Sequence, residues 1–263
     1  MAGAAYLGLM VILALLGPSI APADPTLQNL ADRRAPPGGA YLLGADEFGR
    51  DILSRLLYGT QVALRVAAVS VGAAMVVGTA LGMWAAYYGG WIDFVISRFT
   101  DLLLAFPYLL LAIAVVSALG PGELTAELAV TVWSVPFFAR LARGSIAALL
   151  HAEFVSAARA VGVRERSILV RHMLPNIMSP IVVFGALFVA RAILLESSLS
   201  FLGLGIQPPA ASWGNMMSSG RDFLTIAPHI ATIPGLAITM TVLSANLAAD
   251  GLRDALDPRM KDL

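Results

Sequence analysis

The feature that most constrains this chain is a series of long segments without a charged side chain. A helix that crosses a bilayer needs roughly 20 mostly apolar residues. Five charge-free segments occupy residues 1–23, 66–92, 102–122, 173–190 and 223–249. Residues 124–143 form a weaker sixth candidate, because Glu127 borders one end and Arg140 and Arg143 must extend toward the other interface. The pattern predicts an all-α polytopic membrane protein with about six transmembrane helices.

Composition supports this class and excludes others. Hydrophobic residues make up 58% of the chain and charged residues only 13%, whereas soluble domains are about 25% charged. The net charge is zero, so no basic surface for nucleic acid is indicated. Cysteine is absent, which excludes disulfides and thiolate metal sites.

The first apolar segment ends in Ala21-Pro22-Ala23, which resembles a signal-peptidase site. No basic residue precedes the apolar run, and a proline inside such a site is unfavourable. We therefore expect the first helix to be retained.

The basic residues predict the orientation, because they are enriched in cytoplasmic segments. With the N-terminus inside, ten basic residues are cytoplasmic: Arg98, the six arginines from Arg140 to Arg171, Arg253, Arg259 and Lys261. Five are external: Arg33, Arg34, Arg50, Arg55 and Arg221. This excess predicts a multi-pass plasma-membrane (inner-membrane) protein with both termini in the cytoplasm.

Enzymatic motifs are missing from the sequence. The chain's lysine, Lys261, follows Met260, so the Gly-Lys pair of a nucleotide-binding P-loop cannot form. The three histidines are too far apart for a helical zinc-protease motif. Ser218-Ser219-Gly220 is a weak signal for a serine nucleophile. We expect no enzyme activity and no cofactor or metal in this chain, which leaves a pore, a carrier or the membrane part of a powered transporter.

A polar segment at residues 150–175 separates two apolar ones and is predicted to form two short amphipathic helices joined at Gly162. Each has an apolar face at helical spacing, made of Phe154, Ala157, Ala158 and Val161, and of Ile168, Leu169, His172 and Met173. Pro175 is expected where the chain re-enters the membrane. Two interpretations are open: a projecting knob that docks another protein through Ala157 and Ala158, or a loop that lies on anionic lipid.

The sequence "SAARAVG", followed by "RHMLPN", resembles the EAA loop of permease subunits in ATP-binding-cassette (ABC) importers. Two positions depart from that pattern, with Ser156 in the place of the glutamate and His172 in that of a hydrophobic residue. Glu153, one turn earlier, is a candidate substitute for the carboxylate. The resemblance implies ATPase coupling through seven residues: Glu153, Ser156, Ala157, Ala158, Gly162, Leu174 and Pro175.

Three more stretches, residues 44–64, 198–217 and 250–259, are similar to the C-type permease of the dipeptide/oligopeptide and nickel transport family. The resemblance implies a type I ABC importer permease fold with cytoplasmic coupling helices. Residues 1–60 would form a first transmembrane helix and an external segment, and residues 61–263 the permease core.

The resemblance also implies partners and a cargo. These are a second homologous permease, two ATPase subunits or domains that carry ATP and Mg²⁺, and an extracytoplasmic substrate-binding protein. Di- or oligopeptides are the expected cargo. Nickel, haem or another small solute is the alternative, and a self-contained secondary carrier or channel is a further one.

Other charged and aromatic residues are candidates for transport roles. Arg191 and Glu196 fall within a predicted span, where ionisable side chains tend to face an interior or a pathway; a hydrated position of Glu196 near the outer interface is the alternative. Asp46, Glu47, Arg50 and Asp51 precede a predicted span, where the aspartates are expected to cap a helix while Arg50 and Arg55 pair with them. Direct contact with a delivered ligand is the alternative, and the resemblance adds docking of the binding protein. Trp213 is expected to anchor an external loop, residues 205–220, at the interface, and the resemblance gives Trp213 and Asn215 the same docking role.

Overall fold

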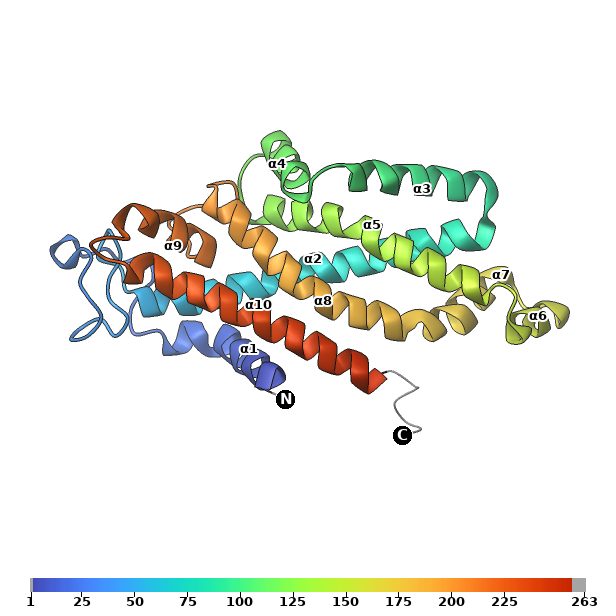
Figure 1. Ribbon diagram of the computed structural model, residues 1–263, viewed down its shortest axis with the longest axis horizontal. Coiled ribbons are helices and arrows are strands. Elements are labelled where there is room, and N and C mark those ends of the chain that lie inside the picture. Colours follow the sequence, from blue (N-terminus) through green and yellow to red (C-terminus); the bar gives the residue numbers. More distant parts are fainter. Residues whose placement is uncertain (1, 257–263) are drawn as a thin grey trace.

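The computed structural model describes residues 2–256 as an elongated bundle of helices without a β-strand in that range (Figure 1). Arg259 and Lys261, used above for the orientation, lie outside the described residues. The helices are α1 (Ala2–Ile20), α2 (Ile52–Tyr88), α3 (Gly90–Ala105), α4 (Tyr108–Leu119), α5 (Glu123–Leu149), α6 (Glu153–Ala160), α7 (Glu165–Ser167), α8 (Leu174–Phe201), α9 (Trp213–Gly220) and α10 (His229–Leu256), with short turns η1 (Leu30–Asp32), η2 (Ile168–Met173) and η3 (Arg221–Phe223).

The prediction of about six spans is confirmed with one change of shape. Five helices in the described range are long and apolar enough to cross a membrane: α1, α2, α5, the continuous helix from α7 to α8, and α10. Helices α3 and α4 are apolar enough only when taken together, are bent by 98° at their junction, and make a sixth span if the pair crosses the membrane as one unit. The apolar run at residues 102–122 is therefore divided between these two helices. Phe106 is extended (ψ 135°) before Pro107, because the proline ring disfavours a helical residue before it.

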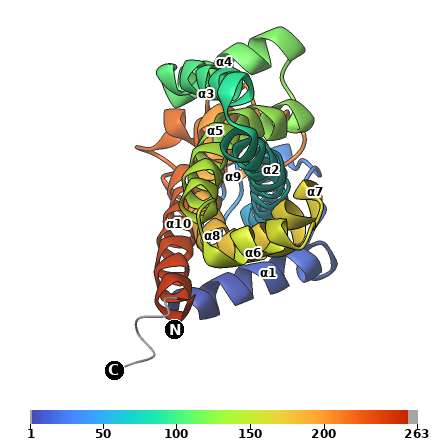
Figure 2. The same ribbon diagram turned by 90° about the vertical axis from the view of Figure 1, so that its right-hand side faces the viewer.

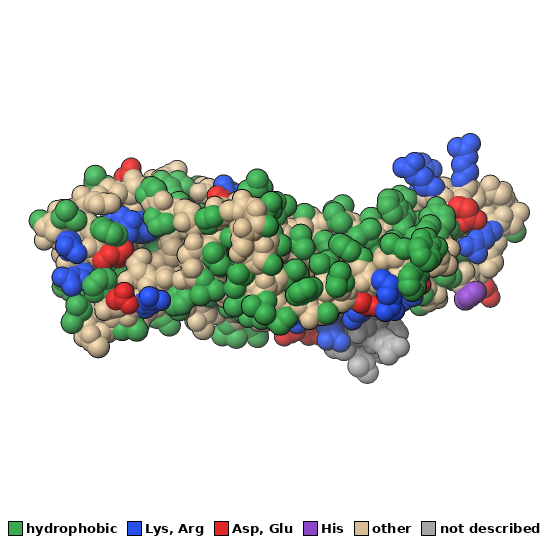
Figure 3. Space-filling model, turned by 90° about the horizontal axis from the view of Figure 1, so that it is seen from above, with side chains coloured by type: hydrophobic (Ala, Val, Ile, Leu, Met, Phe, Trp, Pro, Cys, Tyr) green, Lys and Arg blue, Asp and Glu red, His purple; other side chains and the backbone are tan. Residues whose placement is uncertain are grey.

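The helices surround a centre made of α2, α5 and α8. Viewed along the bundle, α3 and α4 cover one side of this centre, and α1 lies on the opposite side (Figure 2). Charged side chains gather mainly at the two ends, with a largely apolar belt between them (Figure 3). We call the two ends the α6 end and the α9 end. Helix α1 begins and α10 ends on the side of the α6 end.

Helices α2 and α5 cross at very short distance because two glycines face α5. A Cβ atom on Gly78 would lie 2.6 Å from the carbonyl oxygen of Val135, and one on Gly82 would lie 2.1 Å from that of Ala139. Small residues permit this close approach of helix backbones in membranes. The weakest predicted span, residues 124–143, is thus part of the 27-residue helix α5 and of the central contact.

Aromatic side chains fill the contact between α5 and α8. Ring centroids within this cluster lie 4.8–5.6 Å apart, and its members are Trp133, Phe137, Phe138, Phe184 and Phe188. Pro136 and Pro180 lie within α5 and α8, and Pro234 within α10. Each helix continues past its proline, so the prolines do not divide these spans as Pro107 divides α3 from α4.

Two arginines that we expected to extend toward the interface instead form ion pairs between helices. Arg143 binds Asp93 of α3 through two contacts, 2.5 Å from Nε to Oδ1 and 2.7 Å from Nη2 to Oδ2. Arg140 Nη2 lies 2.9 Å from Oδ1 of Asp101. These pairs attach α3 to α5 near the α6 end.

Candidate functional site

Helix α6 projects at one extreme of the bundle (Figure 1). Two small apolar side chains attach it to the body, since Val155 is fully buried and Ala158 is 8% exposed. The chain leaves α6 through Gly162, whose φ of 76° is left-handed and therefore suits glycine. The Gly162 N–H donates to the Arg159 carbonyl and the Val163 N–H to that of Ala158, both at 3.0 Å.

The apolar face predicted for α6 is divided in the structure. Phe154, Ala157 and Val161 are exposed, and Val161 is the most exposed of them at 79%. Ala158 lies on the inner side with Val155, so the expectation that both alanines are on the surface was wrong for Ala158. Glu153 and Ser156 are also exposed and lie on adjacent turns, because they are three residues apart.

The second predicted short helix is not separate. Residues 165–201 form one continuous 37-residue helix, and Leu174 and Pro175 lie within it at the start of α8. Its buried face agrees with the prediction, as Ile168, Leu169 and Met173 are at most 3% exposed. Residues Ile168–Met173 adopt π-helical geometry, in which one extra residue is accommodated per turn.

The two ionisable residues of α8 have opposite environments. Arg191 is exposed, and its guanidinium carbon lies 5.0 Å from the ring centre of Phe188. Glu196 is completely buried and accepts hydrogen bonds from Ser200 Oγ at 2.7 Å and Ser197 Oγ at 3.3 Å. A hydrated position of Glu196 at the outer interface is therefore wrong.

The charged residues before α2 form a buried network at the α9 end. Arg50 Nε lies 2.6 Å from Asp46 Oδ2, and Arg50 Nη2 lies 3.2 Å from Glu47 Oε1. Asp51 caps α2 by accepting the Ser54 N–H at 2.7 Å. The expected capping and pairing are confirmed. The side chains of Asp46, Glu47 and Arg50 are only 4–9% exposed, so they shape the loop from within, and their docking role stays a prediction.

Trp213 and Asn215 also have internal positions. Trp213 is 1% exposed and donates from Nε1 to the Leu56 carbonyl at 3.1 Å. Asn215 forms a reciprocal capping box with Ser212. An interfacial Trp213 and a loop throughout residues 205–220 were wrong expectations, because this box starts helix α9. The signal was the Ser-x-x-Asn spacing, which precedes helices.

Within residues 2–256 no group of three or more His, Asp or Glu side chains is arranged to hold a metal ion. The sequence-based prediction missed the two ion pairs that attach α3 to α5. Their signal is present in the sequence: Asp93 and Asp101 lie about two helical turns apart, and Arg140 and Arg143 about one turn apart. The α6 end thus combines an exposed apolar helix with firm attachment to the spans.

Comparison with known proteins agrees with this arrangement. Residues 78–262 match the family described as binding-protein-dependent transport system inner membrane component, and residues 1–37 match the N-terminal transmembrane domain of oligopeptide transport permease C. The glutathione transport system permease protein GsiD of Pectobacterium atrosepticum is 48% identical over 225 residues, which cover 86% of this chain and 75% of that protein. The dipeptide transport system permease protein DppC of Alkalihalophilus pseudofirmus is 43% identical over 251 residues, or 95% of this chain and 83% of that protein.

The fold is also found among solved structures. An inward-facing conformation of the MetNI methionine ABC transporter superposes with a TM-score of 0.61 at 19% identity, covering 77% of this chain and 96% of the compared chain. At this identity the match concerns the fold. Together with the two family matches, it establishes that the chain belongs to the binding-protein-dependent transport system inner membrane components, as a permease subunit of an ABC importer of the peptide and nickel group.

Proposed function

We propose that this permease moves di- or oligopeptides across the plasma membrane in a complex powered by separate ATPases. The exposed apolar face of α6, made of Phe154, Ala157 and Val161, carries the proposal. No part of residues 2–256 covers this face, and α6 is attached to the spans by Val155 and Ala158. A peptide cargo is supported by the names of two relatives, a glutathione and a dipeptide transport system permease protein.

In this proposal the α6 end and both termini lie in the cytoplasm. Two ATPase subunits or domains bind ATP and Mg²⁺, and one of them receives α6. A second, homologous permease completes the transmembrane path, and an external binding protein delivers the cargo at the α9 end. The chain itself performs no hydrolysis.

The test is ATPase stimulation of the complex purified with its partners and reconstituted in liposomes. Dipeptides, longer peptides, glutathione, nickel and haem are compared, each supplied with the binding protein. Stimulation by peptides is the expected result. Stimulation by nickel or haem alone would overturn the peptide assignment. Purification without any ATPase, or gradient-driven flux through the chain alone, would overturn the powered-importer assignment.

Glu153 is proposed to supply the carboxylate that the EAA pattern has at Ser156. Both side chains are exposed on adjacent turns of α6. We expect Glu153→Gln to lower ligand-stimulated ATPase activity by up to about 5-fold, since an exposed ion pair contributes about 0.2–1 kcal/mol. Adding Ser156→Glu to this variant should restore the activity.

Glu165→Gln is the matched control, because Glu165 is exposed beyond Gly162 and lies 3.8 Å from Arg159 instead. Its activity should equal that of the unmodified complex. Full activity of Glu153→Gln would show that the carboxylate is not needed in this member.

Arg191 is proposed to face the translocation path. An exposed guanidinium within a span is costly in lipid, and no carboxylate among residues 2–256 pairs with it. Its face of α8 is therefore expected to meet water or the second permease. Glu196 would reach the path only if its contacts with Ser197 and Ser200 opened.

The substitution Arg191→Met tests this role. We expect roughly 10-fold weaker uptake of a labelled dipeptide at limiting concentration, since a hydrogen bond to a charged group contributes about 1.5–3 kcal/mol. Arg191→Lys should retain part of the uptake. Leu194→Met, at another exposed position of α8, is the control. Unchanged uptake by Arg191→Met would place the guanidinium outside the path.

A further inference from the structure

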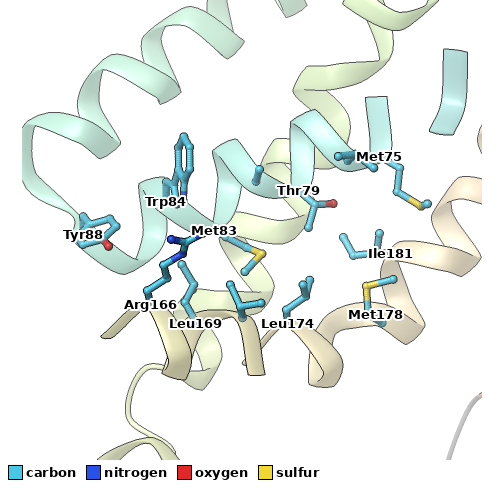
Figure 4. A pocket seen from close by; sticks show the side chains of 13 residues that line it. Met75, Thr79, Met83, Trp84, Tyr88, Arg166, Leu169, Leu174, Met178 and Ile181 are labelled. Atoms are coloured by element: carbon cyan, nitrogen blue, oxygen red, sulfur yellow. The ribbon is translucent and has the colours of Figure 1, made fainter. Parts of the chain in front are cut away.

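A lateral groove lies between α2 and the continuous α7–α8 helix, near the α6 end. Its volume is about 580 Å³, and its walls are mainly apolar. Figure 4 shows Met75 and Met83 on the α2 wall facing Leu174, Met178 and Ile181 on the other. Methionine side chains adapt to irregular and flexible occupants. The groove is therefore suited to a hydrocarbon chain.

The mouth of the groove is basic. Arg166 extends from the α7 side toward α2, close to Met83 and Trp84 (Figure 4). Arg166 and Val170 also line an adjoining pocket of about 430 Å³, whose other lining residues are Arg164, Ser167 and Arg171. The apolar groove thus shares two lining residues, Arg166 and Val170, with a pocket lined by three guanidinium groups.

These arginines have no internal counter-ion. None of Arg164, Arg166 and Arg171 forms an ion pair with a carboxylate in residues 2–256, and the neighbouring Glu165 lies 3.8 Å from Arg159. All three side chains are exposed. The pocket is therefore complementary to an anion that comes from outside the chain.

The groove also has the depth of one membrane leaflet. It extends along α2 from Tyr88 to Met75, a rise of about 20 Å, and half of a bilayer's hydrocarbon core is about 15 Å. Trp84 and Tyr88 are 53% and 55% exposed near the mouth. Aromatic residues of this type favour the membrane–water interface, which places the arginines at the level of the head groups.

We propose that this groove binds one anionic phospholipid from the leaflet at the α6 end. An acyl chain occupies the apolar groove, and the phosphate is held by Arg164, Arg166 and Arg171. Basic pockets between membrane helices bind such head groups. An acidic protein surface or a free phosphate would use the arginines but leave the groove empty, whereas a phospholipid uses both.

Quenching of Trp84 by brominated lipid tests the proposal. The full chain carrying Trp91→Phe, assembled with the partner subunits proposed above, is placed in nanodiscs of phosphatidylcholine. The nanodiscs contain increasing fractions of brominated phosphatidylglycerol or of brominated phosphatidylcholine. The same measurement is made on a variant that carries Trp84→Phe in addition to Trp91→Phe. The quenching that this second substitution removes is attributed to the groove. We expect this quenching to saturate at a lower fraction of brominated phosphatidylglycerol than of brominated phosphatidylcholine. The saturating fraction should differ by about 5-fold for each arginine contact, the equivalent of about 1 kcal/mol per basic residue.

Two variants separate the parts of the site. Replacing Arg164, Arg166 and Arg171 together by glutamine should abolish the preference for phosphatidylglycerol, and Ala80→Phe should reduce the quenching by filling the groove, which Ala80 lines. Arg98→Gln is the control, since Arg98 is exposed and pairs with Asp101 of the same helix.

Several outcomes would overturn the proposal. Equal quenching by both lipids would indicate ordinary contact with bulk lipid. Absence of quenching would show that protein covers the groove. A preference that survives the triple glutamine variant would exclude the arginines. Displacement of the lipid by inorganic phosphate, which we do not expect, would show that the pocket binds a free anion. If the triple glutamine variant lost its ATPase partner but kept its lipid preference, the arginines would be assigned to a protein contact instead.

Discussion

Gly82→Ala is expected to destabilise the permease strongly, although it adds one methyl group. The new Cβ would lie 2.1 Å from the Ala139 carbonyl oxygen and 2.8 Å from the Arg143 backbone nitrogen. Backbone atoms cannot turn aside, so α2 and α5 must separate along their contact. Overpacking of this kind costs about 1–3 kcal/mol, which corresponds to a melting temperature lower by roughly 2–12 °C for a protein of this size.

Gly72→Ala is the matched control on the same helix. Nothing lies within 4 Å of a Cβ atom at Gly72. Alanine has the higher helix propensity, by about 1 kcal/mol, so this variant should be unchanged or more stable. The stability of both variants is measured by heating the purified protein to a series of temperatures. The fraction that still elutes as a monodisperse species is then determined at each temperature. Equal stability of the two variants would mean that the helices do not cross at the distance described.

Gly162→Val is expected to uncouple transport from ATP hydrolysis while the protein stays folded. Gly162 has a φ of 76° and open space around it, so valine would clash with nothing but would be strained in a left-handed conformation. The strain of about 1–2 kcal/mol is relieved by changing the backbone between α6 and α7. Helix α6 would then point in a new direction, and its exposed face would no longer match its partner.

Gly203→Val provides a comparable strain at a different place. Gly203 has a φ of 77°, also with open space around it, and follows α8 at the end of the bundle opposite α6. Both variants should lose similar stability, whereas loss of ligand-stimulated ATPase activity, by roughly 5-fold or more for typical coupling energies, is expected for Gly162→Val alone. If both variants kept full stimulation, α6 would not be the coupling element.

The spans were predictable because each depends on a local property, a run of apolar residues long enough to cross the bilayer. Backbone geometry was harder to predict. Pro107 divides one apolar run into two helices at 98°, and hydropathy contains no information about the size of that angle. The segment after Gly162 has the periodicity of a short helix, yet it continues into α8, since nothing between Glu165 and Pro175 ends the hydrogen-bonded ladder.

The candidate site was predictable as far as its motif, and less so in its contacts. The spacing from Ala157 to Pro175 located the projecting segment around α6, but Ala158 is buried because Val155 and η2 determine how α6 rotates on the body. The charged residues near Asp46 form an internal network with partners distant in sequence, such as Arg55, which donates to the carbonyls of Pro25 and Pro209 at 3.0 and 3.4 Å. Contacts between residues 30 and 154 positions apart produce no periodic pattern in the sequence, so they could not be predicted from it.

The unbroken helix from Glu165 to Phe201 has a mechanical consequence. A helix of this length measures about 55 Å, so a tilt of about 10° around its midpoint would carry its two ends in opposite directions by about 5 Å each. A push on the few residues outside the bilayer at one end would therefore become a displacement of comparable size beside Ser197 and Ser200 at the other. The helix would then tilt as one rigid body, because its backbone hydrogen bonds hold it together, and the pivot of this tilt would lie in the aromatic cluster around Phe188.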